Sequence, residues 1–251
     1  ISERDTLYLA ACTKGANKNS LRRQPNSKIL AKQRAYSLKP SYMTTVYNEY
    51  VLNKKKDERI INDISSFTDS FDFQEFIVSL FKPYFGKSTS ELQNILNLNS
   101  NSKSINSLIV KRILGIKNKV EDIYEFKKAG IIPKTIRIEN DGKIKESMSF
   151  PTFKFNEIID TKWEDSDLYN TLVYQKFLFI IFKKSNKNED YILMDIKFWT
   201  IPDEDLEQCR LVYEKTKEII NEGIIIIEKG NKSVNNLPSQ KENNVMHVRP
   251  H

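Results

Sequence analysis

Apolar side chains recur at two different periods along this chain, a helical one in the first half and a strand-like one in the second. Residues 73–85 and 105–114 carry them at helical spacing, and each stretch ends at a glycine, which is typical of amphipathic helices. Between them, the spacing of Ser88-Thr-Ser-Glu91 predicts a helix start with a capping box. Residues 47–64 are also compatible with a helix.

The period changes to two after Gly130, which predicts strands. Residues 131–138 alternate as a strand, the Asn140-Asp-Gly142 turn reverses the chain, and residues 143–153 return, so we expect a hairpin. Farther along we expect two central strands at residues 175–183 and 191–201, followed by a long helix at residues 202–221. A short strand at residues 224–228, a polar loop at residues 229–244 and a last strand at residues 245–249 complete the chain.

Helices first, then a mixed sheet flanked by a long helix, indicate an α/β or α+β domain over residues 46–251. Residues 1–45 show no sustained helical or strand period and are rich in Lys, Arg, Asn and Ser. We expect them to form an extended basic arm. The length of 251 residues suffices for one substantial core.

Composition argues against several classes of protein. The longest apolar stretches, such as residues 177–182, fall far short of the roughly 18 residues of a membrane span, so no membrane partner is expected. Cys12 and Cys209 have no CxxC spacing or neighbouring histidine, which argues against a disulfide framework or a zinc site. We therefore expect a soluble cytoplasmic protein with two reduced thiols. Because the chain begins with Ile1 rather than Met, we expect it to be part of a longer polypeptide.

The net charge of +7 is concentrated at the start of the chain. Residues 1–56 hold 12 Lys and Arg and 3 Asp and Glu, a balance of +9, which leaves −2 for residues 57–251. Such a patch favours a polyanion, since each cation laid against a phosphate releases condensed counterions. From charge alone, a solubilising tail explains the patch equally well.

One short motif carries the candidate chemistry. Nucleases built on a sheet hold Mg²⁺ with an acid at a strand start and a second acid two residues before a lysine, so that alternate strand positions face one metal ion. Here the strand reads Ile131-Ile-Pro-Lys-Thr135, with Glu125 before it and Lys134 as the lysine. Ile132 stands where the second acid would be, and its hydrocarbon side chain cannot ligate Mg²⁺. By itself this spacing has many chance matches.

The surroundings of the motif resemble a known family. Residues 125–150, EFKKAGIIPKTIRIENDGKIKESMSF, closely resemble the catalytic segment of the MutH mismatch-repair endonuclease and its relatives, the GATC-cutting type II restriction endonucleases. The resemblance implies a restriction-endonuclease-like (MutH-like) mixed sheet flanked by helices. It also implies roles for five positions: Glu125 as the first metal-binding acid, Ile132 as the lost second acid, Lys134 as the catalytic lysine, Glu146 as a further family glutamate and Phe150 as a DNA-proximal phenylalanine.

The resemblance extends over roughly residues 90–251. Lys103 falls on a DNA-contacting lysine at a helix start, although Lys111 stands where the family has a glutamate. The ending His247-Val-Arg-Pro-His251 resembles a GATC-reading turn, in which an arginine followed by proline enters the major groove. The resemblance thus implies that DNA is contacted by Arg249, Pro250 and His251, with Arg249 donating two hydrogen bonds to guanine.

The first segment also resembles this family, but it resembles a part that the family has at the C-terminal end of its domain. Residues 4–16 and 34–43 resemble the C-terminal portion of a GATC-cutting nuclease, including a strand whose lysine, Lys39 here, touches DNA. The simplest explanation is a polypeptide with two copies, in which the tail of an active first copy precedes this second copy. The chain then corresponds to the C-terminal half of a GATC-specific type II restriction endonuclease. An unrelated basic arm is the alternative.

Each candidate residue also has an ordinary explanation. Without its acid partner, Lys134 is explained about equally well as a solvated strand residue. For Glu125 and Glu146, surface carboxylates are the favoured explanation. A lysine at a helix start commonly faces solvent and a phenylalanine commonly lies in a core, which weakens the assignments of Lys103 and Phe150. Near a chain end, Arg249 would be an ordinary surface arginine if the resemblance did not apply.

Three functional hypotheses follow. The first is a domain that binds duplex DNA at GATC without cutting it, needs no cofactor or metal itself, and regulates a Mg²⁺-dependent nuclease domain N-terminal to it in the same polypeptide. The second is an active Mg²⁺-dependent GATC endonuclease that uses Glu125, Glu146 and Lys134 in a rearranged site. The third is a protein-interaction scaffold without a DNA role. The sequence leaves DNA-induced dimerisation open.

Overall fold

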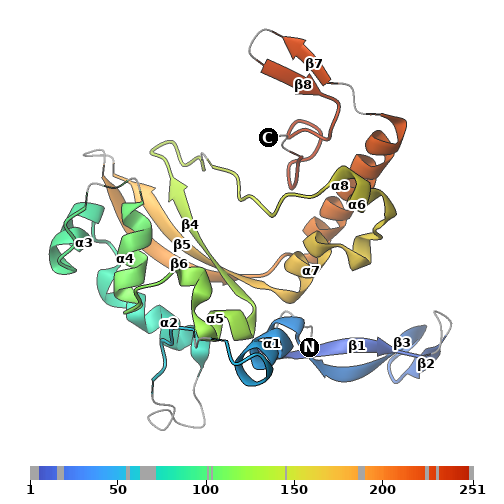
Figure 1. Ribbon diagram of the computed structural model, residues 1–251, viewed down its shortest axis with the longest axis horizontal. Coiled ribbons are helices and arrows are strands. Elements are labelled where there is room, and N and C mark those ends of the chain that lie inside the picture. The colour runs from blue at the N-terminus through green and yellow to red at the C-terminus, as the bar shows by residue number, and fades with distance from the viewer. Residues whose placement is uncertain are drawn as a thin grey trace. The chain divides into compact units, whose positions relative to one another are not determined.

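The chain folds into two compact units, whose helices and strands are labelled in Figure 1. The computed structural model describes residues 6–15, 20–54, 57–62, 72–100, 102, 104–144, 146–185, 190–223, 226–229 and 232–248. The first unit comprises residues 1–147 and 174–199, and the second comprises residues 148–173 and 200–251. Within the described ranges, no helix is both long and apolar enough to span a lipid bilayer.

A mixed sheet underlies the first unit (Figure 1). β4 (Ile131–Ile138) pairs in parallel with β5 (Lys176–Lys184), and β6 (Tyr191–Trp199) pairs antiparallel with the other side of β5. The central place of β5 suits its nearly continuous run of apolar residues. β4 lies at an edge of this sheet, which is where Pro133, lacking an amide donor, is tolerated. The expected mixed sheet is therefore confirmed.

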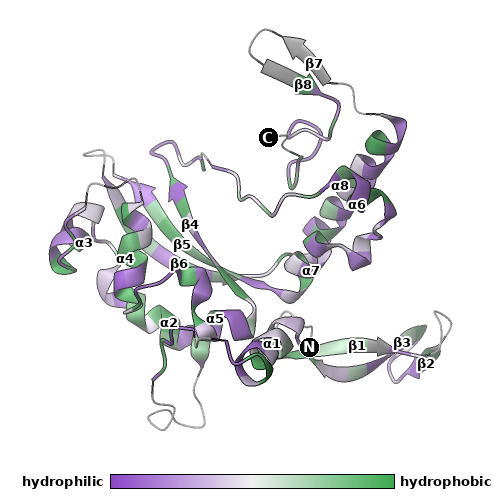
Figure 2. Cartoon of the chain, viewed as in Figure 1, coloured by the Kyte–Doolittle hydropathy of each residue, from purple (hydrophilic) through white to green (hydrophobic). Residues whose placement is uncertain are grey.

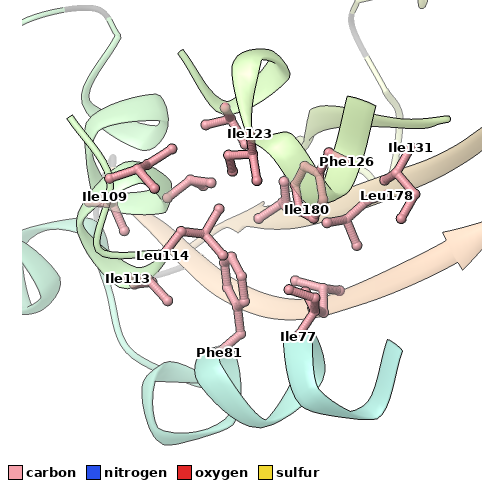
Figure 3. Packing of buried hydrophobic residues seen from close by; sticks show 14 of the residues in the cluster. Ile77, Phe81, Ile109, Ile113, Leu114, Ile123, Phe126, Ile131, Leu178 and Ile180 are labelled. Atoms are coloured by element: carbon pink, nitrogen blue, oxygen red, sulfur yellow. The ribbon is translucent and has the colours of Figure 1, made fainter. Parts of the chain in front are cut away.

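Helices cover one face of this sheet and form the core with it (Figure 3). The core helices are α2 (Phe73–Phe81), α4 (Ile105–Ile113) and α5 (Tyr124–Ala129). The side chains that meet at the centre are each at most 1% exposed: Phe81, Ile109, Phe126, Leu178 and Ile180. Full burial of a side chain of this size contributes roughly 1.5 to 3 kcal/mol, so this cluster holds the helices on the sheet.

The helix ends follow local chemistry that is visible in the sequence. Asp72 accepts hydrogen bonds from two backbone amides of the first turn of α2, which continues into a 3-10 turn at Lys82–Tyr84. Ser88 and Glu91 form the predicted capping box at the start of α3 (Thr89–Ile95). The predicted helices over residues 73–85 and 105–114, the helix start at residue 88, and the strands over residues 131–138, 175–183 and 191–201 are confirmed to within a few residues.

Residues 1–45 do not form an unpaired arm in the part that the structure describes. β1 (Leu9–Lys14) and β2 (Leu21–Gln24) pair antiparallel with the two sides of a long strand, β3 (Ser27–Leu38). The prediction was wrong because the even-numbered positions of β3 mix charged and apolar residues, so that a search for apolar periodicity does not detect the strand (Figure 2). These strands belong to the first compact unit.

The helix predicted over residues 47–64 is also wrong. The helix begins earlier, as α1 (Pro40–Val46), and a π-helical turn over Tyr47–Val51 ends it. Residues 57–62 are not helical, and residues 63–64 lie outside the described part. Pro40 decides the start, since its fixed φ suits the first helical position and its missing amide costs nothing there.

The second unit consists of helices and a short hairpin. Its helices are α6 (Phe155–Asp160), α7 (Asp167–Tyr174, whose last residue belongs to the first unit) and the predicted long helix α8 (Asp203–Glu222), with a 3-10 turn at Trp163–Asp165. The buried Trp163 packs against Tyr169 and Tyr213, with ring centroids 5.4 and 5.2 Å apart. Tyr213 also donates a hydrogen bond to the Thr161 carbonyl, so its polar end is satisfied.

Three predicted stretches near strand ends differ from the structure. Beyond the bridge between Ile138 and Ile144, residues 146–153 form no strand, and Pro151 within them has no amide to donate to a ladder. The expected polar loop contains β8 (Lys232–Asn235), which pairs with β7 (Ile226–Lys229). The Gly-Asn pair between these strands is a two-residue hairpin signal that the loop assignment overlooked. Residues 245–248 form no strand, and residue 249 lies outside the described part.

Candidate functional site

β4 presents two of the predicted catalytic positions on one face of the sheet. Ile131 is buried in the core cluster against the helices, so the alternate residues Ile132 and Lys134 face the opposite side. Both are half-buried. The two-residue spacing therefore aims these side chains at the same space, as the nuclease motif requires.

That face is apolar where a metal-binding acid would be expected. The strand register places Ile132 beside Phe177 of β5, and Phe177 beside Trp199 of β6, so hydrocarbon side chains form a row across the sheet. The ring centroids of Phe177 and Trp199 are 5.7 Å apart, and Phe179 stacks on Phe177 at 6.1 Å. Phe177 is completely buried. An ion placed beside this row would lose hydration without gaining oxygen ligands.

The next row of the same face carries Lys134, Phe179 and Lys197. Asp195 lies two residues beyond Lys197 on β6, and the sequence analysis missed it although the period of two places it on this face. Asp195 lies two strands away from Lys134 across the sheet and is displaced by two residues along the strand direction. The Cα atoms of Asp195 and Lys134 are therefore roughly 12 Å apart. Asp195 accepts a hydrogen bond from the Ile196 amide and lies 4.0 Å from the Lys197 ammonium. It therefore does not replace the missing acid beside Lys134.

Glu125 lies in the first turn of α5, and its carboxylate is engaged. The side chain is 8% exposed and accepts hydrogen bonds from the backbone amides of Ile60 and Ile61, at 3.1 and 3.0 Å. Its two oxygens hold the backbone of residues 60–61 against α5. The ordinary explanation of a solvated surface carboxylate does not describe Glu125, because the residue is buried and has two backbone partners.

Glu125→Gln is expected to lower the free energy of unfolding by about 1.5 kcal/mol, because the amide nitrogen of glutamine would face a backbone donor and one charge-assisted bond would be lost. Chemical denaturation followed by circular dichroism measures this. The control is Glu121→Gln, four residues earlier and exposed, for which the change should stay below about 0.5 kcal/mol. Equal effects of the two variants would contradict the structural role of Glu125.

Glu146 has a different partner. Its carboxylate accepts a hydrogen bond from Arg137 of β4, in an ion pair whose side chains are 67% and 39% exposed. An exposed pair of this kind contributes at most about 1 kcal/mol, so it positions Glu146 only weakly. The structure thus gives Glu125 and Glu146 separate partners, and neither carboxylate pairs with Lys134 in the described part of the chain.

An aromatic cluster anchors the other side of α5. The Lys128 ammonium lies 4.9 to 5.7 Å from the ring centroids of Tyr8, Tyr42 and Tyr124. The Tyr124 hydroxyl donates a hydrogen bond to Glu49 at 2.9 Å. Burial is the main cause that raises the pKa of Tyr124, and this hydrogen bond raises it further. The cluster joins the residue before β1 to the helices α1 and α5. Sequence analysis had no signal for it, because its residues come from three separate segments.

The predicted DNA-contacting residues fall into three groups. Lys39 is 1% exposed and donates from its ammonium to the Thr6 carbonyl at 2.7 Å, so a contact with DNA would require this bond to open. Phe150 is half-buried in the second unit, in a segment without helix or strand. The remaining four lie outside the described residues: Lys103, Arg249, Pro250 and His251.

The side chains around Lys134 do not fit the Mg²⁺ that the sequence resemblance implies. A hard divalent cation needs several oxygen donors, whereas Ile132 offers none and Glu125 is bound to backbone amides. Among the described residues, no group of three or more His, Cys, Asp or Glu side chains is close enough to hold a metal ion. The described side chains around Lys134 therefore offer Mg²⁺ no set of oxygen ligands.

The mixed sheet carries Ile132 and Lys134 on one face of its edge strand, which is the arrangement expected of a nuclease built on a sheet. A family model for the DNA mismatch repair enzyme MutH matches residues 114–211, which include α5 and all three strands of the mixed sheet. The chain is therefore MutH-like and has the restriction-endonuclease fold of that family. Lys103, residues 249–251 and residues 1–45 lie outside the matched range.

One curated relative extends the likeness to the whole chain. The type II restriction enzyme Sau3AI of Staphylococcus aureus is 35% identical over 271 aligned positions, which cover 100% of this chain and 55% of the relative. The expected resemblance to a type II restriction endonuclease is thus confirmed. The chain spans about half the length of that relative.

Proposed function

We propose that this chain binds duplex DNA at GATC sites, without cutting it, as the regulatory part of a type II restriction endonuclease. The observation that carries the proposal is the row Ile132, Phe177 and Trp199. Where a cleaving site would gather oxygen ligands, this row supplies hydrocarbon and aromatic surface, which cannot ligate Mg²⁺. The restriction-endonuclease fold around it is retained.

Support for DNA as the partner comes from the family and from chemistry at the chain's end. MutH is a DNA mismatch repair enzyme, and Sau3AI is a type II restriction enzyme. GATC recognition rests on the resemblance of His247-Val-Arg-Pro-His251 to a base-reading turn, where Arg249 would pair with guanine. Lys103, Phe150 and Lys39 are further proposed DNA contacts.

Regulation requires a difference in DNA affinity between two states of the whole polypeptide. In the proposal, a Mg²⁺-dependent nuclease domain precedes this chain, and DNA bound here favours the cleaving arrangement of that domain. This domain itself needs no cofactor. DNA-induced dimerisation is one arrangement in which two DNA sites could be sensed together.

The rival function is cleavage by this chain with Glu125, Glu146 and Lys134 around a rearranged metal ion. The hydrogen bonds of Glu125 to two backbone amides and the pairing of Glu146 with Arg137 count against it. For Glu125 to reach a metal ion, the loop that it holds would lose both bonds. That loss costs several kcal/mol before any metal is bound.

When the chain is incubated with a GATC-containing duplex and Mg²⁺, we expect no more cleavage than in the same buffer without protein, because the second acid is absent. Lys134→Ala should leave this result unchanged. Cleavage is read on a denaturing gel, with a GATC-cutting restriction enzyme as the positive control for the substrate. The matched control variant is Lys197→Ala, which removes the lysine at the other end of the same row.

Robust cutting that disappears in Lys134→Ala but persists in Lys197→Ala would contradict the non-cleaving role and favour the rearranged site. Cutting that survives both substitutions would point to a contaminating nuclease, and its disappearance after further purification would restore the expected result.

A further inference from the structure

The sheet formed by β1, β2 and β3 has one face open to solvent. Every even-numbered residue of β3 from 28 to 38 is exposed, whereas the odd-numbered residues from 31 to 37 are half-buried. Ala10 and Lys39, on the odd side near α1, are buried. The open face therefore belongs to the even-numbered positions, because side chains alternate across a strand.

Cations, a tyrosine and two leucines, Leu30 and Leu38, occupy that open face. Lys28, Lys32 and Arg34 lie on it, with Tyr36 two residues beyond Arg34 and 93% exposed. Lys28 and Arg34 are six residues apart, a span of roughly 20 Å along the strand. One strand of duplex DNA carries about six phosphates over that length. The dimensions of the face thus match a stretch of DNA backbone.

The charge of this face is not balanced by neighbouring acids. Residues 6–48 contain no Asp or Glu at all. Lys28, Lys32 and Arg34 form no ion pair with the residues that the structure describes. An uncompensated row of cations gains from a polyanion by releasing its counterions, and a tyrosine hydroxyl can donate to a phosphate oxygen.

We propose that the open face of β3 binds the phosphate backbone of duplex DNA without reading its sequence. This inference rests on the proposed function, for which it adds a second contact surface that supplies affinity while residues 247–251 supply base preference. Tyr36 lies at the end of the row and extends the contact beyond Arg34. The opposite face of the same sheet carries Lys14 and Arg22, whose register partners are the odd-numbered Gln33 and Ala31.

The two faces allow a matched comparison. Lys32→Gln with Arg34→Gln removes one lysine and one arginine from the open face, and Lys14→Gln with Arg22→Gln removes the same charges from the other face. Both pairs are exposed and belong to the same small sheet. Binding of the whole chain to a GATC duplex and to a scrambled duplex is measured by fluorescence anisotropy over a series of salt concentrations. Thermal melts confirm that both variants fold.

The open-face variant is expected to weaken binding to both duplexes by the same factor and to reduce the slope of log K against log salt by about 1.8, or 0.9 for each lost phosphate contact. The other-face variant should leave the slope unchanged. The ratio of affinities for the two duplexes should be the same in all three proteins.

An unchanged slope in the open-face variant would overturn the proposal, and so would equal losses in the two variants, which would mean that overall charge rather than a particular face binds DNA. If the face instead pairs with a second copy, sedimentation without DNA would show self-association that Tyr36→Ser abolishes while the slope stays unchanged. A wild-type chain without GATC preference would refute the proposed specificity alone, because the slopes on the scrambled duplex still test the face.

Discussion

Phe126→Ala is expected to lower the free energy of unfolding of the first unit by about 3 to 5 kcal/mol. Phe126 is completely buried where α5 meets the mixed sheet, and its ring packs edge-on against Phe73 with centroids 6.2 Å apart. Removing the ring loses the transfer free energy of its apolar surface and leaves a cavity among helices that cannot fully close around it. Because α5 leads directly into β4, the loss should also loosen the strand that carries Ile132 and Lys134.

Urea denaturation monitored by circular dichroism tests this expectation. Phe155→Ala is the control, since it removes the same ring from a side chain of the second unit that is 43% exposed, and it should change stability by about 1 kcal/mol or less. Hydrogen exchange adds the local readout, with faster exchange expected for the amides of β4 in Phe126→Ala alone. Equal midpoints for the wild type and Phe126→Ala would show that this core does not limit stability.

Arg249→Ala is expected to weaken binding to a GATC duplex by about 1 to 3 kcal/mol, which is roughly a 5-fold to 150-fold increase in Kd. The physical reason is the proposed pair of parallel hydrogen bonds from the guanidinium to guanine O6 and N7, which a methyl group cannot replace. Binding to a scrambled duplex should weaken much less, so the preference for GATC should fall with the affinity.

The matched control for Arg249 is Arg112→Ala, an exposed arginine on α4. Loss of its charge should affect GATC and scrambled duplexes alike, since a phosphate contact carries no sequence information. Titrations of both variants at one fixed salt concentration make the comparison, because affinity for DNA depends steeply on salt. Unchanged DNA binding in Arg249→Ala would contradict base reading and favour the interaction scaffold without a DNA role.

These experiments separate two tasks that a nuclease fold combines. Cutting DNA requires oxygen ligands arranged around a metal ion, and a single isoleucine in place of one carboxylate is enough to remove a ligand. Holding DNA requires cations and hydrogen-bond donors on a surface of the right shape, which need no metal. The chain retains cationic groups suited to the second task, such as those on β3, while the row through Ile132 does not serve the first.

The parts of the fold that local chemistry controls were predictable. Asp72, Ser88 and Glu91 mark helix starts because their side chains satisfy amides that no helix can satisfy itself. The strands β4, β5 and β6 were predictable because their apolar residues alternate or run continuously. The pairing of β1 with β3 was not predictable in this way, since partners such as Leu9 and Leu38 are far apart in the chain.

In the candidate site, too, the sequence determined some features and only the fold decided the others. By itself the sequence determined that an isoleucine stands two residues before Lys134, and side-chain alternation along a strand required both to face one side. Only the tertiary structure decided what surrounds them: Phe177 and Trp199 from two other strands complete an apolar row, and Glu125 turns to the amides of Ile60 and Ile61. The reason is physical, because spacing along a strand is set by covalent geometry, whereas the neighbours across a sheet depend on register and packing between distant segments.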